Sequence, residues 1–215
     1  TPEKSRVMSV QVTPLSDAIG AEITGVDLNE TMDGEVLDTV HAAWLRFKII
    51  LFRGTTLSAD DQPRFAQNFG DIQPIRSATH ILGDNQQFMH VSNRDVDGKP
   101  GVLPEGEMQF HNDQSYYERP AKATILNAIE IPDAGGHTLF MNTVSAYAAL
   151  SADMKARLDG LRVLNIYDYD TNPTIKGDGI RADAPQFEHP VVIHHPETRE
   201  QALFVSRLMS DHITG

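Results

Sequence analysis

The order of helical and strand-like patterns constrains the fold of this 215-residue chain most strongly. Apolar residues recur at helical spacing in residues 31–47 and 58–71, and a further helical stretch covers 143–161. Short apolar or alternating runs, separated by Gly/Pro-rich stretches, make up most of the rest. Helical patterns therefore lie mainly near the start, and strand patterns dominate the remainder of the chain. This order predicts an α+β fold with a mainly β core.

Local signals predict where these elements begin and end. Asp33 and Ser151 are expected to cap helices, and Ser58 and Gly70 to bound the helix between them. The expected strands are residues 8–13, 48–54, 162–170, alternating runs after Pro74, and a hairpin over 189–207. Residues 95–106 and 171–187 are polar and rich in Gly and Pro, which predicts loops, the first a candidate flap.

The charge balance excludes some classes of partner. The chain has 18 Lys and Arg residues against 30 Asp and Glu residues, a formal net charge of −12. Nucleic acids and anionic membranes attract basic surfaces, so neither is an expected partner, whereas one or two Arg side chains suffice locally for a small anion.

There is no cysteine, which excludes disulfides and thiolate metal sites. The N-terminus lacks a signal-peptide core and no 18-residue apolar window occurs, so we expect one cytoplasmic domain over residues 1–215.

One stretch, EMQFHNDQSYYERPAKATILNAIEIPDAGGHTLF (107–140), carries the candidate chemistry. On a strand, Gln109, His111 and Asp113 share one face because side chains alternate. An imidazole and a carboxylate, with one further ligand, form the facial triad of non-haem Fe(II) oxygenases, which leaves metal positions open. The His-x-Asp spacing also occurs by chance in structural pairs. The flanking aromatic residues Phe110, Tyr116 and Tyr117 strengthen the case for a lined pocket, and the spacing by itself leaves both alternatives open.

The region from Phe110 to Phe140 resembles the signature of the taurine dioxygenase (TauD/TfdA-type) family. In that family His-x-Asp is followed by an aromatic residue, a proline, an apolar strand and Gly-Gly-x-Thr. Here these are His111 and Asp113, Tyr116, Pro120, the run ATILNAIE, and residues 135–138. Residues 12–28, 47–71 and 189–207 also resemble family segments, in the family's order.

The resemblance implies a double-stranded β-helix (jelly roll) with flanking helices, and an Fe(II)- and 2-oxoglutarate-dependent dioxygenase. His111 and Asp113 would bind the iron, and the Thr138 hydroxyl would bind the carboxylate of 2-oxoglutarate. The enzyme would hydroxylate a small organic anion resembling a sulfonate, sulfate ester or aryloxy-carboxylate, with dioxygen, releasing succinate and CO₂. Weaker candidates for substrate contacts are Asn93, Gln109 and Tyr116. By analogy with the family, a homo-dimer or homo-tetramer is expected.

The chain departs from the family pattern at its end. The family's second iron-binding His and the Arg partner of 2-oxoglutarate follow a Trp-containing strand pair near the C-terminus, whereas the only Trp here is Trp44. We therefore expect both residues in a C-terminal segment that the 215 residues lack. His189 and His195 match family positions that bind no metal, and a structural role is predicted for them.

Two other functions stay open from the sequence. A cupin-like metalloprotein would keep the His111–Asp113 pair without using 2-oxoglutarate, and succinate formation that depends on 2-oxoglutarate separates it from a dioxygenase. A non-catalytic module that binds a small anion is the second alternative. In that case an exposed sheet edge would favour association with other chains.

Overall fold

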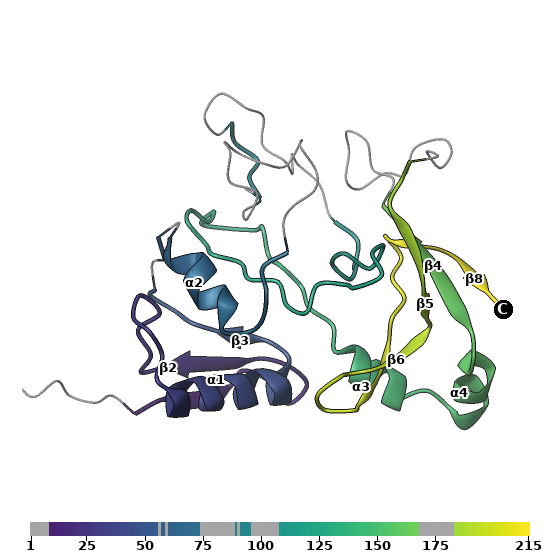
Figure 1. Cartoon of the computed structure of the whole chain (residues 1–215), viewed down its shortest axis with the longest axis horizontal. Helices are drawn as coiled ribbons and strands as arrows, with labels where there is room; N and C mark the ends of the chain where they lie inside the picture. Colours follow the sequence, from purple (N-terminus) through teal and green to yellow (C-terminus); the bar gives the residue numbers. More distant parts are fainter. Residues whose placement is uncertain are drawn as a thin grey trace, which may run out of the picture.

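The computed structural model describes residues 9–55, 57–58, 60–73, 89, 91–95, 108–167 and 183–215. In Figure 1 the described elements form an N-terminal group and a C-terminal group, and the segment from residue 108 to 142 runs between them. The predicted strands after Pro74 and the candidate flap at 95–106 lie almost entirely outside the described residues. The mixture of helices and strands agrees with the predicted α+β class.

The N-terminal group is a three-stranded sheet covered by two helices (Figure 1). Strand β1 (Gln11–Pro14) pairs antiparallel with β2 (Ala21–Thr24), which pairs parallel with β3 (Ile50–Leu51). The strand predicted over 48–54 is therefore confirmed only in its two central residues. A parallel pair needs a crossover connection, and helix α1 (Gly34–Phe47) provides it.

The helix boundaries follow the predicted caps in two of three cases. Asp33 Oδ1 accepts the Val36 N–H at 2.9 Å and Ser151 Oγ accepts the Met154 N–H at 3.2 Å, at the starts of α1 and α4 (Ala152–Leu158). Ser58 is not the cap, because helix α2 (Asp61–Gln67) begins after Asp60. The Ser58 hydroxyl still accepts the Asp61 N–H at 3.1 Å. Ser58 therefore forms a hydrogen bond with the first residue of the helix although it lies two residues before the cap position, Asp60. Helix α3 spans Thr143–Ala148.

The N-terminal core lies between this sheet and its helices. It consists of buried apolar side chains from β2, α1, α2 and the connections between them: Ile23, Leu28, Val40, Ala43, Phe65 and Phe69. Gly25 has φ +82°, and a Cβ there would lie 2.5 Å from the Ser9 carbonyl oxygen. Glycine is therefore required where the chain leaves β2.

The C-terminal group contains the central strand β4 (Arg162–Ile166), which pairs antiparallel with β5 (Gln186–Pro190) and β8 (Ser210–Thr214). A separate hairpin joins β6 (Val192–His194) to β7 (Gln201–Leu203), as the sequence pattern over 189–207 predicted. The strand predicted from 162 is confirmed as far as Ile166. The loop predicted over 171–187 ends earlier than expected, since β5 begins at Gln186; residues 171–182 are outside the described part of the chain.

The apolar run ATILNAIE (123–130) does not form the predicted strand, and neither does the stretch after the Gly-Gly turn. Large apolar side chains here are open to solvent, with Ile129 84% and Ile131 75% exposed. A strand needs a partner to accept its backbone hydrogen bonds, and none of the described strands pairs with residues 120–142. The apolar pattern marked a segment whose side chains favour a strand but which has no pairing partner among the strands that the structure describes.

Ion pairs join the two groups at the turn of the β6–β7 hairpin. Glu197 contacts His41 of α1 at 3.2 Å and Lys122 at 3.1 Å, and Glu200 pairs with Lys48 just after α1. These contacts hold the hairpin turn against α1 and against the segment that follows the candidate site.

None of the described helices is long and apolar enough to cross a membrane.

His195 makes this hairpin turn sensitive to pH. Its Nδ1 accepts the backbone N–H groups of Glu197 at 3.3 Å and Thr198 at 3.1 Å, which requires neutral imidazole. Burial and then the Lys48 ammonium lower the pKa of His195, against smaller opposite effects of Glu197 and Glu200.

A histidine with a lowered pKa stabilises the folded state fully above its unfolded pKa of about 6.5, and this stabilisation is lost as the pH falls below that value. We expect His195→Asn to lower Tm at pH 8 and the difference from wild type to shrink by pH 5. Differential scanning calorimetry across this range tests it, with His194→Asn as the matched control. A Tm difference that is constant with pH would contradict this role of His195.

Candidate metal centre

His111 and Asp113 lie in a turn region and not on a strand. Residues 108–112 have no regular structure, and a turn follows in which the Tyr117 N–H donates to the Gln114 carbonyl at 3.1 Å. Gln114 has φ +55°, so the chain leaves the extended conformation directly after Asp113. The predicted strand face shared by residues 109, 111 and 113 is therefore wrong, although the two candidate ligands still meet.

The side chains of His111 and Asp113 converge. His111 Nε2 lies 3.2 Å from Asp113 Oδ1, and both side chains are partly accessible to solvent. Two neighbouring ligands of an octahedral metal, each about 2.1 Å from the ion, lie about 3 Å apart. The separation of these two atoms therefore suits joint binding of one ion.

The other polar atom of each side chain is held by the protein. His111 Nδ1 lies 2.9 Å from the Gln109 carbonyl oxygen, which can only accept a hydrogen bond, so Nδ1 carries a proton. In neutral imidazole this leaves the lone pair on Nε2, the atom that faces Asp113. The Thr124 hydroxyl donates to Asp113 Oδ2 at 2.5 Å, which leaves Oδ1 facing His111. Partners of this kind orient metal ligands in proteins.

The pair is electrostatically coupled when no metal is bound. The hydrogen bond to Asp113 raises the pKa of His111, opposed by burial and supported by the Gln109 carbonyl. The hydrogen bond from His111 lowers the pKa of Asp113, opposed by burial and supported by Thr124. Each shift has the other residue as its largest cause, so an imidazolium–carboxylate pair persists to a higher pH than an isolated histidine would allow.

This donor set fits two of the three protein ligands of a facial triad. A neutral imidazole nitrogen and a carboxylate oxygen are the ligand types that such an Fe(II) centre uses. Within the part of the chain that the structure describes, no group of three or more His, Cys, Asp or Glu residues is placed to hold a metal ion. A third protein ligand is therefore not assigned to a described residue.

Tyr116, predicted as a weak substrate contact, belongs to an aromatic cluster. Its ring centroid lies 4.7 Å from that of Tyr117 and 4.8 Å from that of Tyr167, and it packs against Leu208 and Met209. Burial raises the pKa of Tyr116 well above its ordinary value. The cluster fixes the C-terminal side of the turn that carries Asp113.

The remaining predicted site residues are exposed. Gln109 contributes its backbone carbonyl to His111, a role that the sequence pattern did not reveal. Asn93 lies in the short described segment 91–95. Thr138 follows a turn in which Gly135 and Gly136 have φ +81° and +64°, as expected for glycines at these positions. The roles of Thr138, Asn93 and Gln109 in binding stay predictions.

Thr124 is the functional candidate that the sequence did not single out. It lies eleven residues after Asp113, in a run taken for a plain apolar strand. A hydroxyl in the middle of an apolar run was the available signal. The sequence did not reveal the partner of this hydroxyl, because Asp113 comes near Thr124 only through the turn at Gln114.

The two histidines for which a structural role was predicted have such roles. His189 is 8% exposed, lies between the rings of Phe187 and Phe204, and its Nε2 is 2.8 Å from the Tyr117 carbonyl oxygen. His195 accepts backbone N–H groups in the hairpin turn. Among the described contacts, neither histidine touches the His111 or Asp113 side chain.

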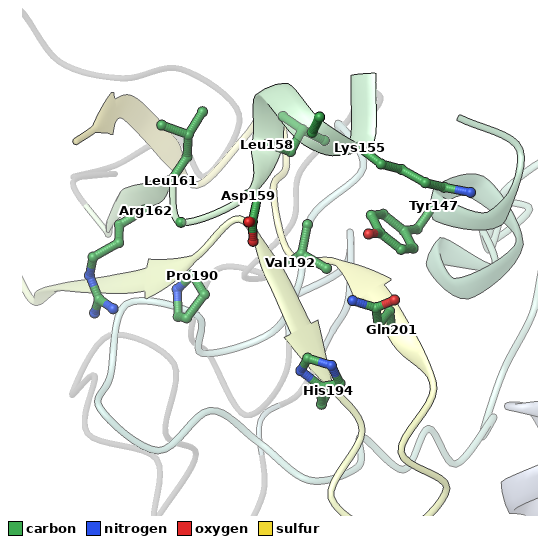
Figure 2. A pocket seen from close by; sticks show the side chains of 12 residues that line it. Tyr147, Lys155, Leu158, Asp159, Leu161, Arg162, Pro190, Val192, His194 and Gln201 are labelled. Carbon is green, nitrogen blue, oxygen red and sulfur yellow. The ribbon is translucent and has the colours of Figure 1, made fainter. Parts of the chain in front are cut away.

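A cavity of about 450 Å³ lies elsewhere, among α3, α4 and the β6–β7 hairpin. Figure 2 shows Tyr147 and Lys155 on the helical side and Val192, His194 and Gln201 on the strand side. The Lys155 ammonium donates to the Ala148 carbonyl at 2.9 Å. None of the predicted site residues lines this cavity, so its size does not make it the catalytic centre.

The pair can be tested without metal. Asp113→Asn removes the carboxylate that stabilises the imidazolium, so the pKa of His111 should fall toward or below the ordinary histidine value of about 6.5. An NMR titration of the His111 ring in chelator-treated protein measures it, with Asp211→Asn, beside His212, as the control. An unchanged His111 pKa in Asp113→Asn would show that the two side chains are apart in solution.

Comparison with known proteins relates this geometry to a family. The family described as "Taurine catabolism dioxygenase TauD, TfdA family" matches residues 11–215. An (S)-phenoxypropionate/alpha-ketoglutarate-dioxygenase from Sphingobium herbicidovorans is 30% identical over 206 residues, covering 91% of this chain and 70% of the relative. An alpha-ketoglutarate-dependent sulfate ester dioxygenase from Pseudomonas putida is 32% identical over 216 residues, covering 94% and 69%.

The fold comparison agrees. The crystal structure of a taurine dioxygenase from Burkholderia xenovorans matches with a TM-score of 0.79 and 30% identity, covering 96% of this chain and 66% of that one. The chain thus spans about two thirds of the length of these relatives. The predicted enzyme class and its cofactors, Fe(II) and 2-oxoglutarate, are those of the matched family. The chain belongs to the TauD/TfdA family of α-ketoglutarate-dependent dioxygenases, as its sequence predicted.

Proposed function

We propose that this protein hydroxylates a small organic anion in an Fe(II)- and 2-oxoglutarate-dependent reaction that consumes dioxygen and releases succinate and CO₂. The observation that carries the proposal is the 3.2 Å approach of His111 Nε2 and Asp113 Oδ1, with the second polar atom of each side chain held by the protein. Family membership supports it over a cupin-like metalloprotein that does not use 2-oxoglutarate and over a non-catalytic module.

In this proposal the protein holds and orients the reactants. His111 Nε2 and Asp113 Oδ1 bind the metal, and the Gln109 carbonyl keeps the imidazole in the tautomer that can bind. The Thr138 hydroxyl donates to a carboxylate of 2-oxoglutarate, and an Arg is expected as its partner. Bound Fe(II) with 2-oxoglutarate supplies the oxidising chemistry. We further propose that the complete core is a double-stranded β-helix, the fold of this family.

The names of two relatives indicate the substrate class. One is named for phenoxypropionate and the other for sulfate esters, and both substrates combine an anionic group with a carbon–oxygen single bond. These names support the substrate class proposed here, a small organic anion resembling a sulfonate, sulfate ester or aryloxy-carboxylate. Because the chain carries a net charge of −12, its site needs a local cation or hydrogen-bond donors to hold an anion.

The substrate contacts proposed here are Asn93, Gln109 and Tyr116. Arg94, next to Asn93, is paired with Glu130 at 2.7 Å, so it contacts an anion only if that exposed ion pair opens. Assembly as a homo-dimer or homo-tetramer and a cytoplasmic location remain part of the proposal. They follow from analogy with the family and from the composition of the chain.

The first test removes each metal ligand. His111→Ala and Asp113→Ala should lower succinate formation from 2-oxoglutarate by more than the 10–100-fold loss typical when only an outer partner of a metal ligand is removed. Succinate is measured with and without Fe(II), and circular dichroism checks that the variants are folded. His212→Ala, a histidine that bonds only to the adjacent Asp211 among its described contacts, is the control. Full activity in either ligand variant would overturn the proposal.

The second test concerns Thr138. Loss of one hydrogen bond to a charged carboxylate costs about 1.5–3 kcal/mol. Thr138→Val should therefore raise the KM for 2-oxoglutarate roughly 10- to 100-fold, while the Kd for the metal alone changes little. Steady-state kinetics and a metal titration measure the two effects. An unchanged KM would remove Thr138 from the cosubstrate site without affecting the assignment of His111 and Asp113.

A further inference from the structure

We infer that Thr124 is a positioning residue that sets which oxygen of Asp113 faces the metal. This rests on the proposed function, because it assumes that Asp113 is a metal ligand. The Thr124 hydroxyl donates to Asp113 Oδ2 at 2.5 Å, and Asp113 Oδ1 faces His111 Nε2. The two carboxylate oxygens thus have different partners before any metal binds.

The direction of the Thr124 hydrogen bond follows from the chemistry of its partner. An aspartate, with an ordinary pKa of about 3.9, is ionised near neutral pH, and an ionised carboxylate can only accept hydrogen bonds. Thr124 therefore donates, and a charge-assisted hydrogen bond of this kind is stronger than one between neutral groups. Thr124 is itself exposed, so burial does not require its hydroxyl to have a protein partner.

Thr124 is held in place by side chains on either side of it. Lys122 pairs with Glu197 at 3.1 Å and its ammonium lies 5.8 Å from the centre of the Trp44 ring. Ile125 packs against the N-terminal core, and Asn127 donates to the Leu57 carbonyl at 3.2 Å. The segment forms no strand, so side-chain contacts position the Thr124 hydroxyl. Most of them are with the N-terminal group, through Trp44, the core around Ile125 and the Leu57 carbonyl, and the Lys122–Glu197 pair adds one to the β6–β7 hairpin.

Asp113, by contrast, is positioned from the C-terminal group. Its turn contains fully buried Ser115, and Tyr116 joins the cluster with Tyr167, Leu208 and Met209. The Thr124–Asp113 hydrogen bond therefore connects the metal-binding turn to a segment that is anchored on the other part of the molecule. A shift between the two parts would change the orientation of the carboxylate.

The expected consequence is single-oxygen binding by Asp113. A carboxylate can bind a metal through one oxygen or through both. A facial triad needs three positions free for the cosubstrate and dioxygen, and a second carboxylate oxygen would occupy one of them. By engaging Oδ2, the Thr124 hydroxyl favours binding through Oδ1 alone.

The test measures binding of Co(II), as a spectroscopic substitute for Fe(II), to the full-length protein. Thr124→Val and Thr124→Ala lack the donor and should weaken Co(II) binding about 10- to 100-fold, the usual effect of losing a partner of a metal ligand. Thr124→Ser keeps the donor and should bind Co(II) about as tightly as wild type does. Thr13→Val, an exposed threonine on β1, is the matched control and should bind as wild type does.

Two further readouts separate positioning from simple folding. The visible spectrum of Co(II), which depends on coordination number, should change in Thr124→Val and Thr124→Ala at saturating metal and not in Thr124→Ser. The Tm of each metal-free variant reports its stability. If Thr124→Val does not fold, Thr124→Ala is used to test the loss of the hydroxyl.

The outcomes distinguish this inference from the function on which it rests. Wild-type affinity and spectrum in Thr124→Val and Thr124→Ala, while Asp113→Asn loses the metal, would overturn the role of Thr124 alone. Equal weakening in Thr124→Ser would also overturn it, because the hydroxyl would then not be the cause. Failure of wild type to bind Co(II), or undiminished binding by Asp113→Asn, would overturn the metal centre itself.

Discussion

The segment from residue 108 to 142 has no strand of its own among the described residues, and this constraint shapes the candidate site. Without a ladder of backbone hydrogen bonds, side chains must set its position. Tyr116 anchors it to the C-terminal group, while Ile125 and Asn127 anchor it to the N-terminal group. Both candidate ligands and Thr124 lie between these anchors, so the site depends on how the two parts pack together.

Within this segment, hydrogen bonds determine which atoms of His111 and Asp113 remain free to bind a metal. The Nδ1–H of His111 donates to the Gln109 carbonyl and the Thr124 hydroxyl donates to Asp113 Oδ2, so Nε2 and Oδ1 are left to face each other. When no metal is bound and His111 is protonated, its imidazolium and the Asp113 carboxylate stabilise one another. A metal ion binding there displaces that proton, so a preorganised pair is present before the ion arrives.

The sequence nominated His111 and Asp113 as candidate ligands from a family resemblance and from a local geometry that is wrong. Alternation on a strand was the expected reason for the meeting of His111 and Asp113, yet the left-handed Gln114 and the turn after it bring their side chains together. The same error hid Thr124, since a residue eleven positions away from Asp113 on an extended chain would lie far from it. Strand prediction failed at ATILNAIE because periodicity reports side-chain preference and does not report a pairing partner.

The family, the α+β class, the caps of α1 and α4 and the β6–β7 hairpin could all be predicted from the sequence, and the assignment of His111 and Asp113 as ligands stays a prediction. These depend on local preference or on motifs, which are properties of short stretches of the chain. The folded arrangement was needed to reveal that Gln109 and Thr124 form hydrogen bonds with the His111 and Asp113 side chains, and that Glu197 connects the hairpin to both α1 and Lys122. The Glu197 contacts join residues distant in sequence, and Thr124 meets Asp113 only because the chain turns, so their geometry is set by folding and not by spacing along the chain.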